Sequence, residues 1–327
     1  MSFEFKIERP AGKAGEEPAV TPLRAFVVGG SGQIGGWLLR VLEARGHQGV
    51  GTYSTREFPG LIPFNAGDRD AVKALIERHR PDVVFYPAGF TWVDGCERDE
   101  PKAMAANLHE PRQVAEAAAE AGARFVYFST DYVFDGVSGP YAEDAEPNAL
   151  SVYGRSKRDA ELALEKSLGD RVLIVRTSWV FGPERQGKNF AYQLVRGLSQ
   201  GKAMTCPSDL VSSPSYGPDV ARAVVELVER GASGLLNVAG PEVMGRVDFA
   251  KAVARAFERD EAGIVSRLND ELGQAAPRPL NSGLLIDRLE QALPGRMRPL
   301  DVSLRDFRSK LESPELRPWV EPILPPA

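Results

Sequence analysis

Cysteine and histidine are scarce in this sequence of 327 residues. The only two cysteines, Cys96 and Cys206, lie far apart and form no Cys-x-x-Cys pair, and the three histidines are scattered. Disulfide frameworks and metal sites built from these residues need several of them at short, regular spacings. The sequence therefore predicts neither a disulfide scaffold nor a bound metal ion.

Long apolar runs and runs of basic residues are also missing. No apolar stretch approaches the roughly 18 residues that cross a bilayer, and the first ten residues contain no signal-peptide core. The formal net charge is -5, and Lys and Arg form no run of the kind that binds nucleic acid. We therefore expect a cytoplasmic protein that binds small molecules, with no membrane or nucleic-acid partner. The composition leaves open whether the chain forms a homodimer.

The chain alternates strand-like and helical segments over most of its length. At 43% hydrophobic and 26% charged residues it can bury a large core. This alternation predicts an α/β fold, a Rossmann-type doubly wound parallel sheet with a smaller C-terminal substrate-binding lobe. The predicted divisions are an N-terminal extension outside the core fold (residues 1–21), an NAD(P)-binding Rossmann domain (residues 22–183) and mainly the substrate-binding lobe (residues 184–327).

The first strand, at residues 23–28, runs into a glycine-rich turn and then into an apolar helix at residues 37–44. Glycines in such a turn let the backbone approach a pyrophosphate, which lies against the free N–H groups of the helix. The spacing is Gly-x-x-Gly-x-x-Gly, and a turn of this kind can also merely connect a strand to a helix. The cofactor-binding residues predicted here are Gly29, Gly32, Gln33, Ile34 and Gly35.

The second strand, at residues 48–53, is followed by hydroxyls and a guanidinium instead of an acid. An Asp or Glu at this place accepts a hydrogen bond from the ribose 2′-OH of NAD. Ser54 and Arg56 suit a 2′-phosphate, which favours NADP(H) and leaves NAD(H) open, although Arg56 could also be a solvated loop residue. Ala88 and Gly89, after the third expected strand, are small enough for a cofactor to pass close by.

Polar side chains follow the aromatic and β-branched strand at residues 124–128. Thr130 and Asp131 lie at its carboxyl end, where ligands bind in open parallel sheets. Tyr153 and Lys157 are four residues apart in an Ala-, Leu-, Glu- and Lys-rich segment, so on a helix they share one face. A nearby ammonium lowers the pKa of a phenol and makes it an acid–base catalyst. The alternative is a half-buried tyrosine beside a solvated lysine.

The remaining elements follow from local patterns. A polar residue, Asn107, interrupts an apolar helical stripe and is expected to hydrogen-bond a neighbouring turn. Further helices are expected at residues 68–80, 101–121, 153–166, 189–199, 218–230 and 247–259, and further strands at residues 81–86, 171–176 and 235–239.

Six ordered motifs between about residues 23 and 293 resemble the extended short-chain dehydrogenase/reductases, and within them the dTDP-4-dehydrorhamnose reductase family. They are Gly-Gly-Ser-Gly-Gln-Ile-Gly, Pro-Asp-Val-Val followed by Thr-Trp-Val-Asp, Ser-Thr-Asp-Tyr-Val-Phe-Asp-Gly, Ser-Val-Tyr-Gly-Arg-Ser-Lys, Arg-Thr-Ser-Trp-Val-Phe-Gly with Gly-Lys-Asn-Phe, and Arg-Pro-Leu-Asn-Ser.

The resemblance implies an NADPH-dependent reductase of a 4-keto-6-deoxy nucleotide sugar. Thr130, Tyr153 and Lys157 would be the catalytic hydroxyl, acid and cation, with Asp131 beside them. The substrate-binding residues it implies are Thr91, Val93, Asp94, Trp179, Asn189 and Arg278. The alternative is a non-catalytic NADP-binding regulatory subunit, resembling that of methionine adenosyltransferase. The complete Thr, Tyr and Lys set favours the enzyme.

The chain departs from the family pattern in three places. Asp-Leu-Val-Ser-Ser-Pro-Ser, at residues 209–215, replaces Asp-Gln-x-Gly-x-Pro-Thr, so the family's Gln and Gly are absent. Phe-Tyr-Pro-Ala-Gly stands before Thr91 where Asn-Ala-Ala is typical, and the extension at residues 1–21 has no family counterpart. These departures bear on the identity of the sugar nucleotide, and they leave the predicted hydride-transfer residues intact.

Overall fold

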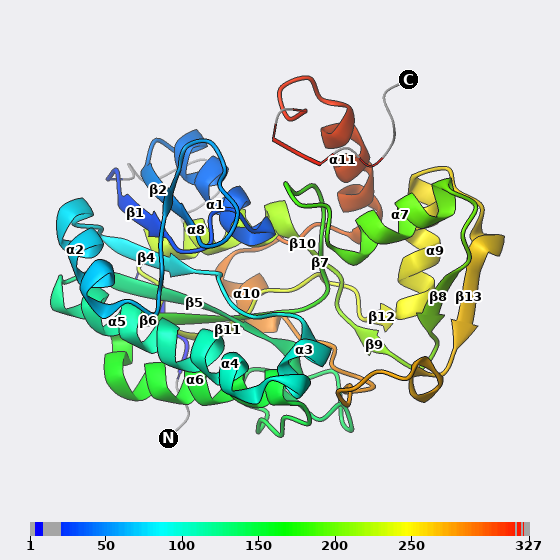
Figure 1. Ribbon diagram of the computed structural model, residues 1–327, viewed down its shortest axis with the longest axis horizontal. Helices are drawn as coiled ribbons and strands as arrows, with labels where there is room; N and C mark the ends of the chain where they lie inside the picture. Colours follow the sequence, from blue (N-terminus) through cyan, green and yellow to red (C-terminus); the bar gives the residue numbers. More distant parts are fainter. Residues whose placement is uncertain (1–3, 9–20, 318, 322, 324–327) are drawn as a thin grey trace.

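A seven-stranded parallel sheet forms the larger of two lobes in the computed structural model (Figure 1). The structure describes residues 4–8, 21–317, 319–321 and 323. The strand order is β11-β6-β5-β4-β1-β2-β3, so the chain reverses direction across the sheet between β1 and β4. The strands are β1 (Arg24–Val27), β2 (Gln48–Tyr53), β3 (Leu61–Pro63), β4 (Val83–Tyr86), β5 (Arg124–Thr130), β6 (Val172–Thr177) and β11 (Gly234–Asn237). This doubly wound arrangement confirms the predicted fold class.

Helices cover both faces of this sheet (Figure 1). On one face lie α2 (Arg69–His79), α5 (Glu110–Glu120) and α6 (Val152–Leu168); on the other lie α1 (Gln33–Ala44) and α8 (Gly217–Glu229). The alternation of side chains along β1 shows how the two layers form. Ala25 and Val27 enter the core under α1 and α8, whereas Phe26 enters the core under α2 and α5. Strands buried on both faces explain the nearly continuous apolar runs in the sequence.

The smaller lobe follows the carboxyl end of β6. Two helices, α7 (Phe190–Ser199) and α9 (Arg246–Ala256), pack beside the paired strands β8 (Met204–Pro207) and β13 (Ile264–Arg267). The aromatic side chains of Tyr192, Phe249 and Phe307 form its buried core, and Phe307 comes from α11 (Leu300–Glu312). Two short pairings complete the lobe: β7 (Val180–Phe181) with β10 (Ser215–Tyr216), and β9 (Val211–Ser212) with β12 (Met244–Gly245).

The structure corrects several of the expected elements. The helix expected at residues 101–121 consists of α4 (Glu100–Met104), the π-helical segment η1 (Ala105–His109) and α5. Several short elements were missed: strand β3, helix α3 (Val93–Arg98) and the short strands of the smaller lobe. Helix α1 begins four residues earlier than expected. The boundary at residues 183/184 is also incomplete, because α8 and β11 return to the Rossmann sheet. None of the helices within the described ranges is long and apolar enough to cross a membrane.

The described part of the N-terminal extension, residues 4–8, lies against the core. Lys6 forms an antiparallel bridge with Ser233, with backbone hydrogen bonds of 3.0 and 2.9 Å. Phe5 and Ile7 pack on the core that α1 and α8 cover. Residues 9–20 of the extension lie outside the described residues. The described part therefore adds an edge contact beside β11.

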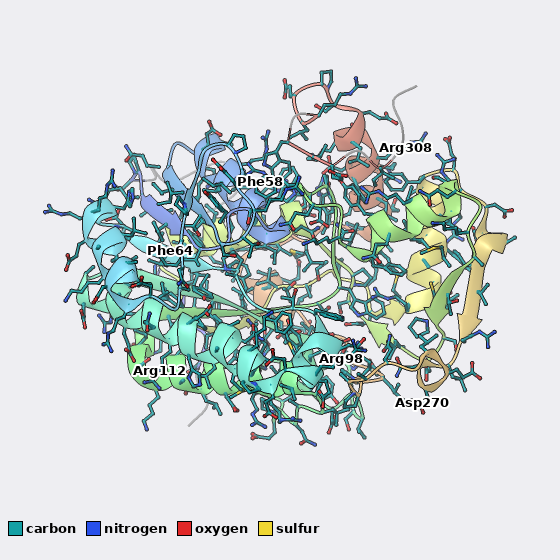
Figure 2. All side chains as sticks on the ribbon, in the orientation of Figure 1. Phe58, Phe64, Arg98, Arg112, Asp270 and Arg308 are labelled. Atoms are coloured by element: carbon teal, nitrogen blue, oxygen red, sulfur yellow. The ribbon has the colours of Figure 1, made fainter. Side chains whose placement is uncertain are left out.

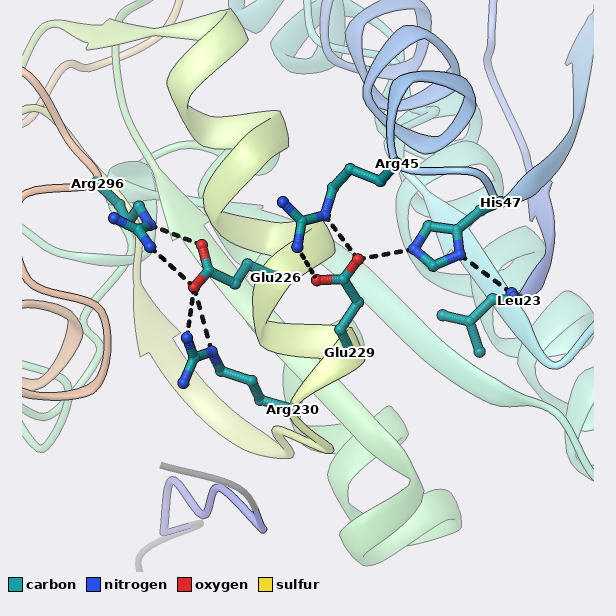
Figure 3. A network of polar contacts seen from close by, with 7 residues as sticks. All are labelled: Leu23, Arg45, His47, Glu226, Glu229, Arg230 and Arg296. Carbon is teal, nitrogen blue, oxygen red and sulfur yellow. Dashed lines mark hydrogen bonds and ion pairs between the residues drawn. The ribbon is translucent and has the colours of Figure 1, made fainter. Parts of the chain in front are cut away.

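A polar cluster joins α1 to α8 at the ends of both helices (Figure 3). Arg45 makes two hydrogen bonds to the carboxylate of Glu229, of 2.6 and 2.7 Å. His47 Nε2 lies 2.7 Å from the same carboxylate, and His47 Nδ1 accepts a hydrogen bond from the backbone N–H of Leu23. Because Nδ1 is the acceptor, Nε2 carries the hydrogen and donates a hydrogen bond to Glu229. The cluster thus connects the start of β1 to both helices.

Candidate active site

The glycine turn after β1 faces the end of β4 at the point where the strand order reverses. Gly29 has a φ of +91°, and a side chain added there would lie 3.0 Å from the Cβ of Ala88. A side chain on Gly35 would collide with the carbonyl oxygen of Gly29, so α1 can approach the turn only with glycine there. Two predicted cofactor positions, Gly29 and Ala88, therefore meet at the switch point, where such folds bind dinucleotides.

The first turn of α1 is open to an anion. Its N-cap, Gly32, provides no side-chain hydrogen bond, so the first N–H groups of α1 keep their donor capacity. The side chain of Gln33 is turned away and donates to the carbonyl oxygen of Gly182 over 3.4 Å, while Ile34 packs on the core. These residues fit a pyrophosphate through the backbone, with Gln33 and Ile34 holding the turn in place.

The loop after β2 carries the residues expected to select the cofactor. Ser54 and Arg56 are both exposed, and the Arg56 guanidinium carbon lies 5.2 Å from the centre of the Phe58 ring. At the end of β4, Gly89 lies directly beneath the side-chain oxygen of Asn107. This buried Asn107 pairs with both backbone groups of Phe90, which lies in the loop after β4 and not in a neighbouring turn of the helix. It also donates to Ser156 on α6 over 3.0 Å.

Tyr153 and Lys157 lie on the face of α6 that packs against β5. The Ser151 hydroxyl caps the helix by accepting from the N–H of Gly154, which fixes where the helix starts. Both side chains are buried, and Lys157 Nζ lies 4.0 Å from the centre of the Tyr127 ring. A solvated lysine, the alternative that the sequence left open, is therefore wrong.

Burial changes the acid–base properties of this pair. It raises the pKa of Tyr153 well above its ordinary range, and the Thr130 hydroxyl opposes this rise. Burial also lowers the pKa of Lys157 to about 7. The expectation that the ammonium lowers the pKa of the phenol is thus wrong for this structure, because desolvation outweighs any help from the lysine. The phenol is held in its protonated form.

Asp131 is buried among hydroxyl groups at the end of β5. Its carboxylate accepts hydrogen bonds from Thr130 (3.1 Å), from Ser212 (3.0 Å) and from Ser282. Burial raises the pKa of Asp131 to about 6, and the three hydroxyls act against that rise. Ser212 and Ser282 come from segments far from β5 in the sequence, so Asp131 ties those segments to the carboxyl end of β5.

Two further hydroxyls at the strand ends lack partners. Ser129 Oγ, in β5, and Thr177 Oγ1, in the neighbouring strand β6, are buried and make no hydrogen bond within the described residues. Thr177 lies opposite Thr130 in the strand register. Buried polar groups are almost always satisfied, so orphaned hydroxyls beside Thr130 are consistent with groups that a bound ligand would pair.

The residues expected to bind the substrate lie in different surroundings. Asp94 and Arg278 form an ion pair of 3.0 Å between α3 and the segment before Ser282, near the Tyr132 ring. Thr91 is exposed, and Val93 packs with Tyr153. Asn189 caps α7 by accepting from Tyr192 N, and its amide donates to Gly182 and Glu184. The Asn189 side chain is therefore fully used within the protein.

Arg246 was not among the site residues predicted from the sequence. Its guanidinium carbon lies 4.0 Å from the centre of the Trp179 ring and 4.1 Å from that of Phe190. Its Nη1 is buried and has no hydrogen-bond partner among the described residues, and burial lowers its pKa to about 10. Trp179, whose φ is +38°, also stacks on Phe249. The indole ring of Trp179 thus contacts both Arg246 and Phe249.

The doubly wound sheet, the glycine turn at its switch point and the Tyr-Lys pair on one helix face define the class of extended short-chain dehydrogenase/reductases. Residues 23–313 match the model of one family, described as the RmlD substrate binding domain. The chain belongs to this family, as its sequence motifs predicted.

Relatives whose names indicate different roles are similar to this chain at nearly the same sequence identity. A dTDP-4-keto-6-deoxy-D-glucose reductase of Streptomyces niveus is 31% identical over 257 residues, covering 78% of this chain and 86% of the relative. The methionine adenosyltransferase 2 subunit beta of Danio rerio is 30% identical, covering 84% and 87%. The crystal structure of dTDP-4-dehydrorhamnose reductase from Bacillus anthracis in complex with NADP has a TM-score of 0.80 at 26% identity, covering 89% and 100%.

Proposed function

We propose that this protein is an NADPH-dependent reductase that converts the 4-keto group of a 6-deoxy nucleotide sugar to an alcohol. One observation carries the proposal: Thr130 from β5 and Tyr153 and Lys157 from α6 converge in one buried region at the carboxyl end of the sheet. The names of the reductase relatives support the substrate class, and the smaller lobe is the element that would hold the sugar nucleotide.

In this proposal the cofactor supplies a hydride to the carbonyl carbon when it is bound. The raised pKa of Tyr153 keeps its phenol protonated, so it can give that proton to the oxygen that becomes an alkoxide. Thr130 turns its hydroxyl from Asp131 toward the same oxygen and stabilises the developing charge. Lys157, which has no ion pair among the described residues, would hold the nicotinamide ribose and would offset the negative charge left on Tyr153.

The rival proposal is a non-catalytic, NADP-binding regulatory subunit. It is supported by the similarity to a methionine adenosyltransferase 2 subunit beta, which covers most of both chains. Fold and cofactor site are compatible with either role, because function depends on the residues at the site. The Thr, Tyr and Lys set favours the reductase, since a regulatory subunit has no need of a proton donor.

The deciding experiment is NADPH oxidation by the purified protein with a panel of 4-keto-6-deoxy nucleotide sugars that differ in nucleotide and sugar configuration. The reductase proposal predicts turnover with at least one of them, and its loss in Tyr153→Phe. NADPH binding measured on the same preparation is the control. Tight binding of NADPH with no turnover on any sugar would favour the regulatory role.

A further inference from the structure

Arginine and aromatic side chains alternate along one side of the glycine turn. The guanidinium carbon of Arg185 lies 5.3 Å from the ring centre of Phe58 and 5.4 Å from that of Trp319. The guanidinium carbon of Arg56 lies 5.2 Å from the ring centre of Phe58, and that of Arg40 lies 5.3 Å from the ring centre of Trp319. We call these five residues the arginine stack. Its members come from the loop after β2, the loop after β7, helix α1 and the C-terminal segment.

The arginine stack carries positive charge without acidic partners. Within the described ranges, Arg40, Arg56 and Arg185 form no ion pair with a carboxylate. Arg185 Nε and Nη1 are buried and make no hydrogen bond to described residues. Burial lowers the pKa of Arg185, and the charge of Arg40 lowers it further. A buried guanidinium without hydrogen-bond partners lowers the stability of the fold unless an anion accepts its hydrogen bonds.

The arginine stack lies next to the predicted dinucleotide site. The residue after Arg185, Gln186, donates a hydrogen bond of 3.0 Å to the carbonyl oxygen of Ser31 in the glycine turn. A side chain on Gly36, in the first turns of α1, would collide with the Trp319 ring. Phe58 lies in the loop after β2, on the upper side of the sheet lobe (Figure 2). The end of β2 is where dinucleotide folds meet the ribose 2′ position.

We propose that Arg185 is a second determinant of cofactor choice, which binds the 2′-phosphate of NADP(H) together with Arg56. This inference rests on the proposed function only in assuming a dinucleotide cofactor. A phosphate monoester is a compact dianion, and arginine meets it with paired, charge-assisted hydrogen bonds. The two unpartnered nitrogens of Arg185 provide this capacity, and cation–π contacts with Phe58 and Trp319 help to hold its guanidinium in place.

The C-terminal segment holds Arg185 in place, although it lies beyond the part of the chain that matches the family. The match ends at residue 313, whereas Trp319 and Glu321 follow it. Glu321 N donates to the carbonyl oxygen of Glu184 over 2.8 Å, and the Trp319 ring packs edge-on against Trp37 at 4.9 Å. Trp37 Nε1 in turn donates to Pro183 O over 2.7 Å. The two residues before the arginine are thereby anchored.

The test measures binding of two nucleotide fragments by calorimetry. The probes are 2′,5′-ADP, which carries the 2′-phosphate, and 5′-AMP, which lacks it. We expect Arg185→Gln to weaken 2′,5′-ADP about ten- to a hundred-fold and to leave 5′-AMP unchanged. Arg185→Lys keeps the charge without the paired donors, so its affinity for 2′,5′-ADP should lie between those of the wild type and of Arg185→Gln. Arg112→Gln, on the opposite face of the sheet, is the matched control for net charge and should change neither.

Three outcomes would overturn the inference. Equal weakening of both fragments would place Arg185 on a group that they share, and no weakening of either would remove it from the site. Wild-type protein that binds the two fragments equally well would show that no 2′-phosphate site exists. Trp319→Phe, which keeps an aromatic ring, checks that Arg185→Gln acts locally, because it should retain most of the preference. Since the test uses no nucleotide-sugar substrate, failure to find a nucleotide sugar that the protein reduces would not affect these results.

Discussion

Ser212 donates a hydrogen bond of 3.0 Å to the buried carboxylate of Asp131, and this contact joins strand β9 to the carboxyl end of β5. Ser282 donates to the same carboxylate from the Arg-Pro-Leu-Asn-Ser motif. Ser212 stands where the family pattern has glycine. The departure in that motif therefore has a physical role in this chain: it adds a hydroxyl that helps a buried acid to remain ionised.

Asp131 should make the stability of the fold depend on pH. Its pKa is raised to about 6, against roughly 3.9 for an exposed Asp, so the native state binds the proton more tightly than the unfolded chain. Its contribution is therefore full below about pH 4 and is lost as the pH rises to about 6, at a cost of about 3 kcal/mol. Asp131→Asn should remove this slope, as measured by urea unfolding at a series of pH values. An unchanged slope would contradict the assignment.

Ser212→Gly tests the same carboxyl from its partner. Removing one donor favours the neutral acid, so the pKa of Asp131 should rise further and the upper end of the pH window should move up. Ser208→Gly is the control, because its exposed hydroxyl bonds only a backbone carbonyl, that of Arg267. A window that stays in place in Ser212→Gly would show that the hydrogen bond does not stabilise the carboxylate.

The buried ammonium of Lys157 should lower the stability of the fold. Its pKa is lowered to about 7, so protonation destabilises the fold as the pH falls from about 10.5 toward 7. Lys157→Met keeps the length and removes the charge, and should stabilise the protein at neutral pH by about 1–4 kcal/mol while turnover is lost. Lys166→Met, at an exposed position of the same helix, should do neither. A destabilised Lys157→Met would mean that the ammonium has a structural partner.

Tyr153→Phe removes the proton donor and leaves the ring. Because general acid catalysis contributes about 10²- to 10⁴-fold, kcat should fall by that factor while NADPH binding is retained. Tyr132→Phe is the matched control: its ring lies 5.7 Å from that of Tyr153, edge to face, and its phenol is on another element. Near wild-type kcat in Tyr153→Phe would refute the assignment, and equal loss in both variants would point to disturbed packing.

Local patterns predicted much of the fold and little of the site's electrostatics. The glycine turn and the Tyr153–Lys157 pair could be found because each lies within one strand–turn–helix or one helix face. The pKa of Tyr153 was predicted in the wrong direction, because spacing shows proximity but not burial. Arg246 and Arg185 were missed because their aromatic neighbours come from distant segments of the chain, so no local motif marks them.

Arg246 and Trp179 should differ in what their loss affects. Arg246→Gln removes a charge that burial already disfavours, so the melting temperature should hold while KM for the sugar nucleotide rises about tenfold or more. Trp179→Ala removes a ring packed on Arg246 and Phe249, and should raise KM and lower the melting temperature together. KM for NADPH is the internal control. An unaltered sugar KM in Arg246→Gln would exclude this arginine from the substrate site.

The Glu229 cluster should stabilise the fold without touching catalysis (Figure 3). The carboxylate is nearly inaccessible, with 4% of its side chain exposed, and it satisfies both Arg45 and the buried ring of His47. Glu229→Ala leaves the Nε2–H of His47 without its acceptor, so the free energy of unfolding should fall by about 1–3 kcal/mol. We expect a value toward the lower end of this range, because Arg45 is partly exposed to water. Chemical denaturation measures this change, and kcat should stay at the wild-type value. Asp301→Ala, which breaks the exposed pair with Arg305, is the control and should leave stability unchanged within error. If both variants were equally stable, the contacts between α1 and α8 would depend on apolar packing alone.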